Sequence, residues 1–548
     1  MHPLLNTPLH SSAVSVLFCT MLTLLYNSSL WTLIFTETHS QSLFFLSFFV
    51  FLVSAFNLLL ACICFKWIQK PVLISIILVS AVVSYFMHDY GVVFDKNMIQ
   101  NIVETDSHEA LDLINISMLL HLALYGILPA LIISRIRISY ARPMQQLKRQ
   151  ILMATLSVIT LVAAVLPFYK TYSSLFRNHR EVRHLLVPSN VLYYGARYLS
   201  GAYNESRQPL VHIGLDAKRE TIWDAQQKPV ITILVVGETA RAANFALNGY
   251  PRDTNPELQQ QNIINFNQVT SCGTSTAVSL PCMFSDWNRS NYNGDHVQSR
   301  ENVLDVIKRA GIDVVWRDNN SGCKGVCERI NKQGTSGPET TITCLESECF
   351  DEMLLDNLDS YLAKNNGDTL IVLHQKGSHG PAYDKRYPDE FSIFKPTCKT
   401  GDLQRCSRQE IINAYDNSIR YTDYFLSKVI NYLKAHEKRY TTAMLYVSDH
   451  GESLGEHNVF LHGLPYFLAP DEQKHVPMII WLSPDYQAQF HISKKCLDDK
   501  SSQSFSHDNI YHSLLGLMAV STGNYAQDMD IISPCQTSDQ PLKTIAKR

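Results

Sequence analysis

Apolar residues are distributed unevenly along this chain, and the long apolar runs lie in its first 170 residues. Crossing a bilayer of about 30 Å takes about 20 residues, so each of five runs is long enough to span a membrane. The first run lacks a cationic start and a small-residue cleavage site, which indicates a retained span rather than a signal peptide. The five predicted spans are residues 13–35, 43–65, 71–90, 113–136 and 151–169.

The short loops between these runs predict the orientation. Lys66 and Lys70 flank one loop and a basic cluster from Arg135 to Arg149 flanks another, whereas residues 91–112 are acidic apart from Lys96. The positive-inside rule therefore places the amino terminus in the cytoplasm. An odd number of spans then delivers the rest of the chain to the opposite side of the membrane.

Residues 169–204 mix basic and aromatic side chains. This mixture is typical of helices in the membrane interface, although a plain linker with surface helices would also fit. The predicted organisation is a five-span transmembrane domain over residues 1–170, interfacial helices and linker over 171–228, and a globular domain over 229–548.

Beyond residue 229, uniformly apolar segments alternate with amphipathic ones, as in an α/β fold whose sheet is covered on both faces. We expect a doubly wound sheet. The predicted strands are residues 230–236, 312–316, 369–374, 443–448 and 476–482, and the predicted helices are 301–310, 351–365, 407–437 and 507–520.

Polar side chains follow several of these strands directly. Glu238 comes after the first strand, residues 374–379 begin and end with histidine, and Asp449 and His450 follow another strand. The hydroxyl-rich stretch 271–276 ends at Thr276. Ligands of α/β sheets bind beyond the carboxyl ends of the strands, so we expect these groups to converge. Glu238 alone could be a helix cap and Thr276 alone a turn residue, but together the nitrogen and oxygen donors suit zinc.

The net charge and the cysteine content bear on the partners of the protein and on its compartment. The formal net charge of −3 gives no signal for nucleic-acid binding. Ten of the 13 cysteines lie beyond the last predicted span, which favours disulfides in an oxidising compartment. The spacing of Cys323 and Cys327 would also fit half of a zinc finger. The simplest pairing joins neighbours: Cys272 with Cys282, Cys323 with Cys327, Cys344 with Cys349, Cys398 with Cys406, and Cys496 with Cys535.

A threonine hydroxyl needs a base or a metal to become a nucleophile. The chain has no Gly-x-Ser-x-Gly elbow and no Walker loop, which disfavours an α/β-hydrolase and a P-loop kinase. Zinc lowers the pKa of bound water to about 7, and a bound hydroxyl should gain similarly. A threonine nucleophile activated by a metal therefore fits this sequence better than an α/β-hydrolase or a P-loop kinase does.

Several ordered motifs carry a family resemblance. Gly-Glu-Thr-Ala-Arg at 237–241, Thr-Ser-Cys-Gly-Thr-Ser-Thr-Ala at 270–277, Ser-His-Gly-Pro at 378–381, Ser-Asp-His-Gly-Glu at 448–452 and Leu-His-Gly at 461–463 resemble the lipid A phosphoethanolamine transferases, the group that includes the mobile colistin resistance enzymes. The resemblance extends over essentially the whole chain. It implies an alkaline phosphatase-like catalytic domain in the periplasm, anchored in a Gram-negative inner membrane.

The resemblance also implies roles for individual residues. It makes Glu238, Thr276, Asp449 and His450 the zinc ligands and Thr276 the nucleophile. The residues implied to bind the phosphoethanolamine group are Asn320, Lys324, His379 and His462, and those implied to handle substrate near the membrane are Asn101, Thr105 and Glu109. A second, weaker zinc ion at His379 and His462 is a further expectation, although His462 could instead be a core histidine.

The implied reaction transfers phosphoethanolamine from phosphatidylethanolamine to a phosphate of lipid A through a covalent threonine intermediate. The added amine would lower the negative charge of the envelope and confer polymyxin and colistin resistance. We expect a monomer with no nucleic-acid partner. The alternatives are transfer to core sugars or another glycan, a membrane-bound zinc phosphatase or sulfatase-like hydrolase, and a non-catalytic scaffold.

Overall fold

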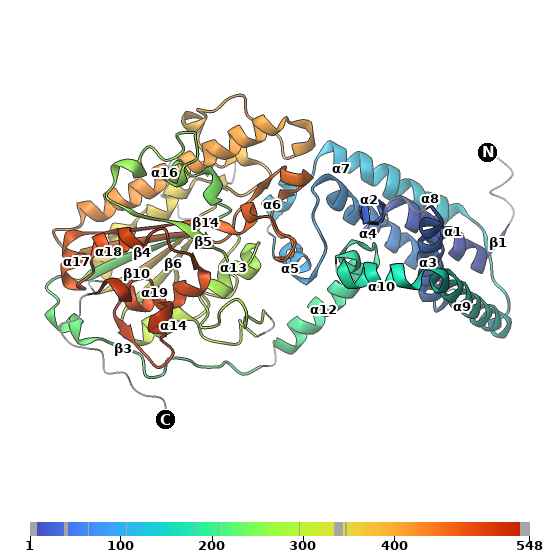
Figure 1. Ribbon diagram of the computed structural model, residues 1–548, viewed down its shortest axis with the longest axis horizontal. Helices are drawn as coiled ribbons and strands as arrows, with labels where there is room; N and C mark the ends of the chain where they lie inside the picture. Colours follow the sequence, from blue (N-terminus) through green and yellow to red (C-terminus); the bar gives the residue numbers. More distant parts are fainter. Residues whose placement is uncertain are drawn as a thin grey trace. The chain divides into compact units, whose positions relative to one another are not determined.

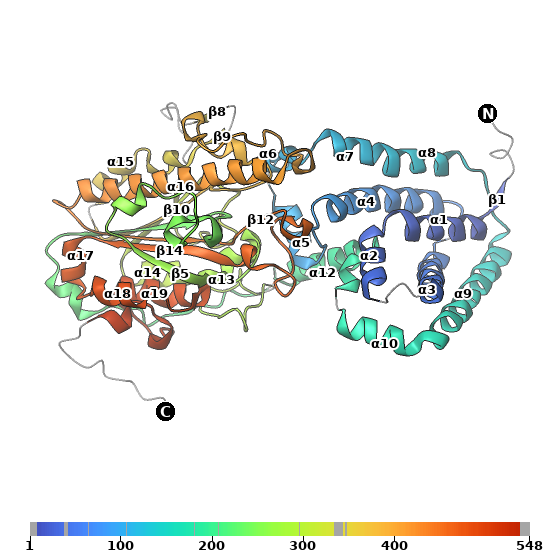
Figure 2. The same ribbon diagram turned by 45° about the horizontal axis from the view of Figure 1, so that its top comes forward.

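The chain folds into two compact units, an all-helical unit and an α/β unit (Figures 1 and 2). The first unit comprises residues up to Ile99 together with Ile114–Arg197, and the second comprises Gln100–Leu113 together with the chain from Tyr198 onward. The computed structural model describes residues 8–37, 42–63, 65–105, 107–179, 181–205, 208–294, 296–333, 344–345, 348–365 and 367–536.

Each predicted span corresponds to helix. Among the residues described, four helical stretches are long and apolar enough to cross a membrane, and a bent pair can be counted as the fifth span. That pair is α1 (Ser11–Leu25) and α2 (Ser28–Glu37), whose axes differ by 67°. The others are α3 (Ser42–Ala61), α4 (Gln69–Asp89), the run of α7 (Ile116–His121), a π-helix (Leu122–Ile127) and α8 (Leu128–Arg135), and the stretch that begins with α9 (Pro143–Val165).

Polar side chains join the helices of this unit internally. Ser54 Oγ lies 2.8 Å from Thr160 Oγ1, and the Asn57 amide donates to Ser157 Oγ at 3.0 Å, which links α3 to α9. Three helices follow α9: α10 (Tyr169–Asn178), α11 (Val182–Leu185) and α12 (Ser189–Glu205). Their position in the membrane interface stays a prediction.

The α/β unit is built on an eight-stranded mixed sheet in the order β15-β5-β14-β11-β4-β10-β6-β7. The five strands β11, β4, β10, β6 and β7 are parallel, and β14 runs antiparallel between β11 and β5. The bounds are β4 Val230–Gly237, β5 Ile264–Thr270, β6 Asp313–Asp318, β7 Asn331–Gln333, β10 Thr369–His374, β11 Thr441–Ser448, β14 His475–Leu482 and β15 Phe505–Ser506.

All five predicted strands are present, as β4, β6, β10, β11 and β14. Three further strands of this sheet were not predicted. β7 and β15 are short, and in β5 the polar Asn265 and Asn267 interrupt the apolar run. β5 is held by its pairing with β14, a contact that the local pattern does not encode.

Helices cover both faces of the sheet. Figure 2 shows α15 and α16 on one face and α14, α18 and α19 on the other. Every residue of β4 and of β11 is buried, as expected for strands covered on both sides. The bounds are α14 Val303–Arg309, α15 Leu358–Lys364, α16 Arg408–Ala435, α18 Lys494–Lys500 and α19 Ile510–Leu517.

Two predicted helices are shorter than their patterns suggested. The pattern over 351–365 divides into a 3₁₀ turn, Asp351–Leu355, and α15, because Asn357 between them adopts a left-handed conformation with φ of 56°. The pattern over 507–520 begins with a 3₁₀ turn capped by Ser506, and the α-helix starts at Ile510. By contrast, α16 begins where predicted, at a capping box of Ser407 and Glu410.

Disulfides join neighbouring cysteines of the α/β unit. The bonds are Cys272–Cys282, Cys323–Cys327, Cys398–Cys406 and Cys496–Cys535. Cys349 is also disulfide-bonded, and its backbone lies opposite that of Cys344 in a two-stranded ribbon. The Cys344 side chain lies outside the described part of the chain.

Candidate active site

The two carboxylates and one histidine of the site follow the ends of two adjacent strands. β4 ends at Gly237 and is followed by Glu238, and β11 ends at Ser448 and is followed by Asp449 and His450. Ser448 pairs with Gly237 across the parallel ladder, so the residues that follow emerge side by side. Glu238, Asp449 and His450 are all fully buried.

Thr276 reaches the same point from another element. It is the first residue of α13 (Thr276–Met283), which follows β5 and the hydroxyl-rich turn. Thr276 Oγ1 donates to Glu238 Oε2 at 3.0 Å and lies 3.4 Å from His450 Nε2. An anion approaching this hydroxyl would also meet the N-terminal end of α13, where free N–H groups and the helix dipole favour negative charge.

The four groups fit a metal ion such as zinc. Ligand atoms of Glu238, Asp449 and His450 lie within 4.8 Å of one another. His450 Nε2 is 3.2 Å from Glu238 Oε1 and 3.4 Å from Asp449 Oδ2, and that buried Oδ2 accepts no hydrogen bond from the described residues. Burying two carboxylates side by side, one of them with an oxygen that accepts no hydrogen bond, destabilises the fold unless a positive charge lies between them.

The protonation of His450 supports the same reading. His450 Nδ1 lies 2.9 Å from the Gly451 carbonyl oxygen, which can only accept, so Nδ1 carries the proton in that hydrogen bond. Burial by itself lowers the pKa of His450, but the Asp449 and Glu238 carboxylates outweigh it and raise that pKa to about 10, so without a cation Nε2 is protonated between them. A metal ion held there would take the place of that proton on Nε2, while the backbone carbonyl holds Nδ1. Burial raises the pKa of Asp449, and the charge on Glu238 raises it further. A bound cation would relieve both effects.

Asn320 orients Glu238. Its amide donates to Glu238 Oε2 at 2.6 Å and to the Gln375 carbonyl at 3.0 Å. The Asn320 backbone N–H in turn donates to Asp318, and the other carboxylate oxygen of Asp318 lies 3.3 Å from His374 Nδ1. The loops after β6 and β10 are thereby joined behind the site.

Two further histidines lie near His450. The rings of His379 and His462 have centroids 5.3 Å apart, and those of His450 and His462 are 4.4 Å apart. His462 Nδ1 is 2.8 Å from Glu452 Oε2, and Tyr383 donates to the other oxygen of Glu452 at 2.6 Å. Sequence reasoning gave Glu452 no role. Its position two residues after His450 was the available signal.

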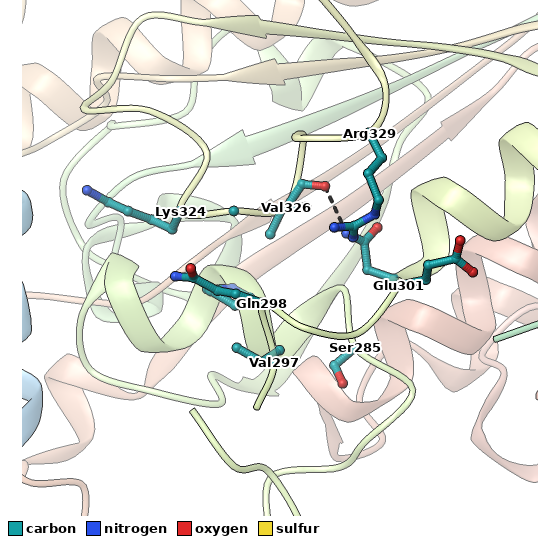
Figure 3. Close-up of a pocket in the computed structure, with 10 residues that line it drawn as sticks. Ser285, Val297, Gln298, Glu301, Lys324, Val326 and Arg329 are labelled. Carbon is teal, nitrogen blue, oxygen red and sulfur yellow. Dashed lines mark hydrogen bonds between the residues drawn. The ribbon is translucent and has the colours of Figure 1, made fainter. Parts of the chain in front are cut away.

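Lys324 sits on a strained, cross-linked loop. The Cys323–Cys327 disulfide closes the loop, and Lys324 has φ of 47°, a left-handed conformation that costs a non-glycine residue roughly 1 kcal/mol or more. Figure 3 shows its side chain extending away from Val326 and Glu301, with which it lines a small pocket. Lys324 Nζ donates to the Ser321 carbonyl at 3.2 Å and lies 3.7 Å from a Glu104 carboxylate oxygen.

Glu104 belongs to the segment that carries the predicted membrane-proximal residues. Asn101 lies in α5 (Lys96–Glu104), and its carbonyl accepts from the Thr105 hydroxyl at 2.6 Å. Glu109 lies in α6 (Ser107–Asp112), but its side chain is outside the described residues. The structure therefore connects this segment to Lys324, while the roles of Asn101, Thr105 and Glu109 stay predictions.

His507 was missed by sequence reasoning, since a lone histidine at a helix start carries little signal. It is buried, its Nδ1 accepts from the Cys272 N–H at 3.2 Å, and its Nε2 donates to the Ser448 carbonyl at 3.0 Å. It thereby links the turn that leads to Thr276 with the strand end that leads to Asp449. Burial lowers the pKa of His507 from 6.5 to about 4, so it is neutral at pH 7.

We expect His507→Phe to destabilise the protein, and to do so more at pH 7.5 than at pH 5.5. The change leaves a buried N–H and a buried carbonyl unpaired, at about 1–3 kcal/mol each. In wild type, unfolded His507 binds a proton that the folded residue does not, so stability falls as the pH drops from 6.5 toward 4. The phenylalanine variant lacks this loss.

Melting temperatures of the detergent-purified protein at the two pH values measure the effect. The gap between wild type and variant should be several degrees at pH 7.5 and narrower at pH 5.5. A gap that is constant or widens on acidification would show that His507 is not the neutral bridge described here.

Comparisons with known proteins agree with this geometry. A family model described as phosphoethanolamine transferase EptA/EptB matches residues 52–203, and a sulfatase model matches residues 231–520. Phosphoethanolamine transferase EptA of Escherichia coli K12 is 44% identical over 501 residues, 90% of each chain. Phosphatidylethanolamine transferase Mcr-1 of E. coli is 40% identical over 427 residues, 76% of this chain and 79% of the relative.

Solved structures extend the likeness to the fold. The integral membrane lipooligosaccharide phosphoethanolamine transferase A of Neisseria meningitidis superposes with a TM-score of 0.92 at 35% identity, covering 97% of this chain and all of the other. The periplasmic domain of EptC from Campylobacter jejuni gives 0.53 at 42% identity, covering 60% of this chain. These matches confirm the predicted fold, a helical membrane domain followed by an alkaline phosphatase-like domain, and the predicted location in the inner membrane with a periplasmic catalytic domain.

Proposed function

Because the chain belongs to the phosphoethanolamine transferase family of EptA and Mcr-1, we propose that it moves phosphoethanolamine from phosphatidylethanolamine to a phosphate of lipid A. The observation that supports this most is the Thr276 hydroxyl, placed at a helix N-terminus against Glu238 and His450. This is a nucleophile with a site for an activating cation beside it. A non-catalytic scaffold would have no need of either.

In the first half of the reaction, Thr276 Oγ1 forms a bond to the phosphorus of the donor lipid. As Oγ1 gives up its proton, the bond from phosphorus to the diacylglycerol oxygen breaks and that oxygen takes up a proton, so the proton count of the step balances. A zinc ion held by Glu238, Asp449 and His450 would lower the pKa of the Thr276 hydroxyl and offset negative charge in the transition state. Asn320 fixes Glu238, so the reacting oxygen keeps a constant position.

Phosphoryl transfer spreads negative charge over the phosphoryl oxygens, and cationic and imidazole side chains stabilise that charge. We assign binding of the phosphoethanolamine group to Lys324, Asn320, His379 and His462, with the two histidines also stabilising the leaving oxygen. Burial lowers the pKa of His462, and the neighbouring His450 lowers it further. His379 and His462 could also hold a second ion.

In the second half, a lipid A phosphate oxygen attacks the phosphoethanolamine carried by Thr276, and Thr276 leaves as the free hydroxyl. The product bears an added amine, which reduces the negative charge that attracts cationic peptides. The proposal therefore includes resistance to polymyxin and colistin. It also includes the division of the chain into a transmembrane domain (1–170), interfacial helices and linker (171–228) and a catalytic domain (229–548). Asn101, Thr105 and Glu109 handle the substrate in this proposal, and the enzyme is a monomer.

The proposal is tested by expressing the protein in a polymyxin-sensitive Gram-negative host and analysing its lipid A by mass spectrometry. We expect a phosphoethanolamine on lipid A and growth at polymyxin concentrations that kill the control strain. The control strain expresses Thr276→Ala at the same level. Phosphoethanolamine found only on core sugars would show that the acceptor is a core sugar and not lipid A. Release of free phosphoethanolamine without any modified glycan would favour the hydrolase alternative.

A further inference from the structure

The segment Gln100–Leu113 lies between two membrane helices in the sequence but folds with the catalytic unit. Asp112, near its end, is 8% exposed. One oxygen of Asp112 accepts from Lys385 Nζ at 2.5 Å, and the other accepts from Arg386 Nη2 at 3.0 Å. An acidic side chain of the segment is thus held by two cations of the catalytic domain.

The backbone of the segment packs as closely as its side chain does. A Cβ atom added to Gly401 would lie 2.3 Å from the Asp112 carbonyl oxygen and 3.3 Å from Pro381. No L-residue with a side chain fits there unless the backbone shifts. Gly401 is therefore part of the docking site for Asp112.

Arg386 connects this docking site to the active site. Its side chain is 1% exposed, and its Nε donates to the His379 carbonyl at 2.7 Å while Nη2 donates to Asp112. A buried guanidinium requires a partner for its charge, and Asp112 supplies it. The two bonds use different nitrogens, so loss of the Asp112 charge leaves the bond to His379 in place.

The other end of the segment contacts the active-site lysine. The Glu104 carbonyl accepts from Lys324 Nζ at 3.2 Å, and the Glu104 carboxylate lies 3.7 Å from the same atom. The segment therefore spans from Lys324 to the loop of His379, two groups to which we assign the donor headgroup. Between and beside these contacts it exposes large apolar side chains: Ile102 is 52%, Val103 60% and Leu111 62% exposed.

We infer that Asp112 is a positioning residue for the lipid part of the donor. It fixes the segment 100–113 so that Ile102, Val103 and Leu111 form an apolar wall for the diacylglycerol moiety, while the headgroup reaches Lys324 and His379. Water-exposed apolar side chains on a docked segment are explained by such an occupant, since in the sequence the segment lies between two membrane helices, α4, which ends at Asp89, and α7, which begins at Ile116. The inference rests on the proposed function and specifies how its donor is recognised.

Two donors with the same reacting group distinguish an effect on binding of the acyl chains by the apolar wall from an effect on the reaction at phosphorus. Dioleoyl phosphatidylethanolamine carries acyl chains, whereas glycerophosphoethanolamine has none. With each donor, formation of the Thr276 adduct is followed on full-length protein in mixed micelles without acceptor. The variants are Asp112→Asn and Gly401→Ala, and the matched control is Gly367→Ala, where an added Cβ meets nothing within 4 Å.

We expect Asp112→Asn and Gly401→Ala to lower kcat/KM for the dioleoyl lipid about tenfold or more, and to leave the value for glycerophosphoethanolamine within twofold. Gly367→Ala should match wild type with both donors. Arg386→Ala should impair both donors, because it also removes the bond to His379. Hydrogen exchange in residues 100–113 should rise in the two docking variants and stay unchanged in the control.

Equal losses with both donors would overturn the inference, because Asp112 would then act only through general stability. Unchanged rates with the dioleoyl lipid despite faster exchange in the segment would overturn it as well. A wild-type protein that forms no adduct with either donor would instead contradict the proposed function itself.

Discussion

Thr276→Ala is expected to abolish phosphoethanolamine transfer while leaving the protein folded. The substitution removes Oγ1, which donates to Glu238 and lies 3.4 Å from His450 Nε2, and loss of a catalytic nucleophile commonly lowers kcat by about 10³-fold or more. Thr276 is buried, but the lost atoms are a hydroxyl and a methyl, so the stability cost is about 1 kcal/mol.

The comparison with neighbouring residues makes this prediction specific. Ser275 is also buried and precedes α13, yet its side chain makes no capping hydrogen bond, so Ser275→Ala should keep most of the activity. Thr276→Ser retains a hydroxyl and should retain part of it. Transfer to lipid A is measured by mass spectrometry, and folding is measured by the melting temperature. A fully active Thr276→Ala protein would exclude Thr276 as the nucleophile.

Removal of the metal is expected to have an effect of similar size. Chelation should abolish transfer, and added zinc should restore it, because the ligand atoms of Glu238, Asp449 and His450 lie within 4.8 Å of one another beside Thr276. Stripping should also lower the melting temperature, since two adjacent buried carboxylates then lose their counter-charge. Asp449→Asn keeps the shape of the side chain and removes its charge.

Metal content gives a readout that is independent of activity. Elemental analysis should find zinc bound to the wild-type chain and little or none bound to Asp449→Asn. Chelation should then lower the melting temperature of wild type and leave that of Asp449→Asn unchanged. Equal zinc content in the two proteins, or unimpaired turnover after stripping, would remove Asp449 from the metal site.

Much of this fold could be predicted because two simple constraints act on the sequence. A bilayer demands long apolar helices, and strands covered on both faces demand continuous apolar runs. The bend between α1 and α2 was not predictable in this way. Asn27 lies at the bend, and its amide donates to the Leu22 and Val187 carbonyls while its oxygen accepts from the Val187 N–H. The partner that stabilises the break is 160 residues away.

In the candidate site too, the residues placed by strand ends were predictable, and those that depend on distant contacts were not. Glu238, Asp449 and His450 were predictable because each follows a parallel strand, and parallel strands end at a common edge. Glu452 and His507 were not, because their roles depend on contacts with His462, Cys272 and Ser448 that no strand pattern specifies. The Asp112–Arg386 pair joins residues 274 positions apart.

The most direct test of the account is to find the covalent intermediate. The purified, zinc-loaded protein is incubated with phosphatidylethanolamine without acceptor, digested, and fragmented by mass spectrometry. We predict one phosphoethanolamine on Thr276, absent from Thr276→Ala and lost when lipid A is added. An adduct on Thr274 or Ser275, or none while transfer to lipid A proceeds, would contradict the account.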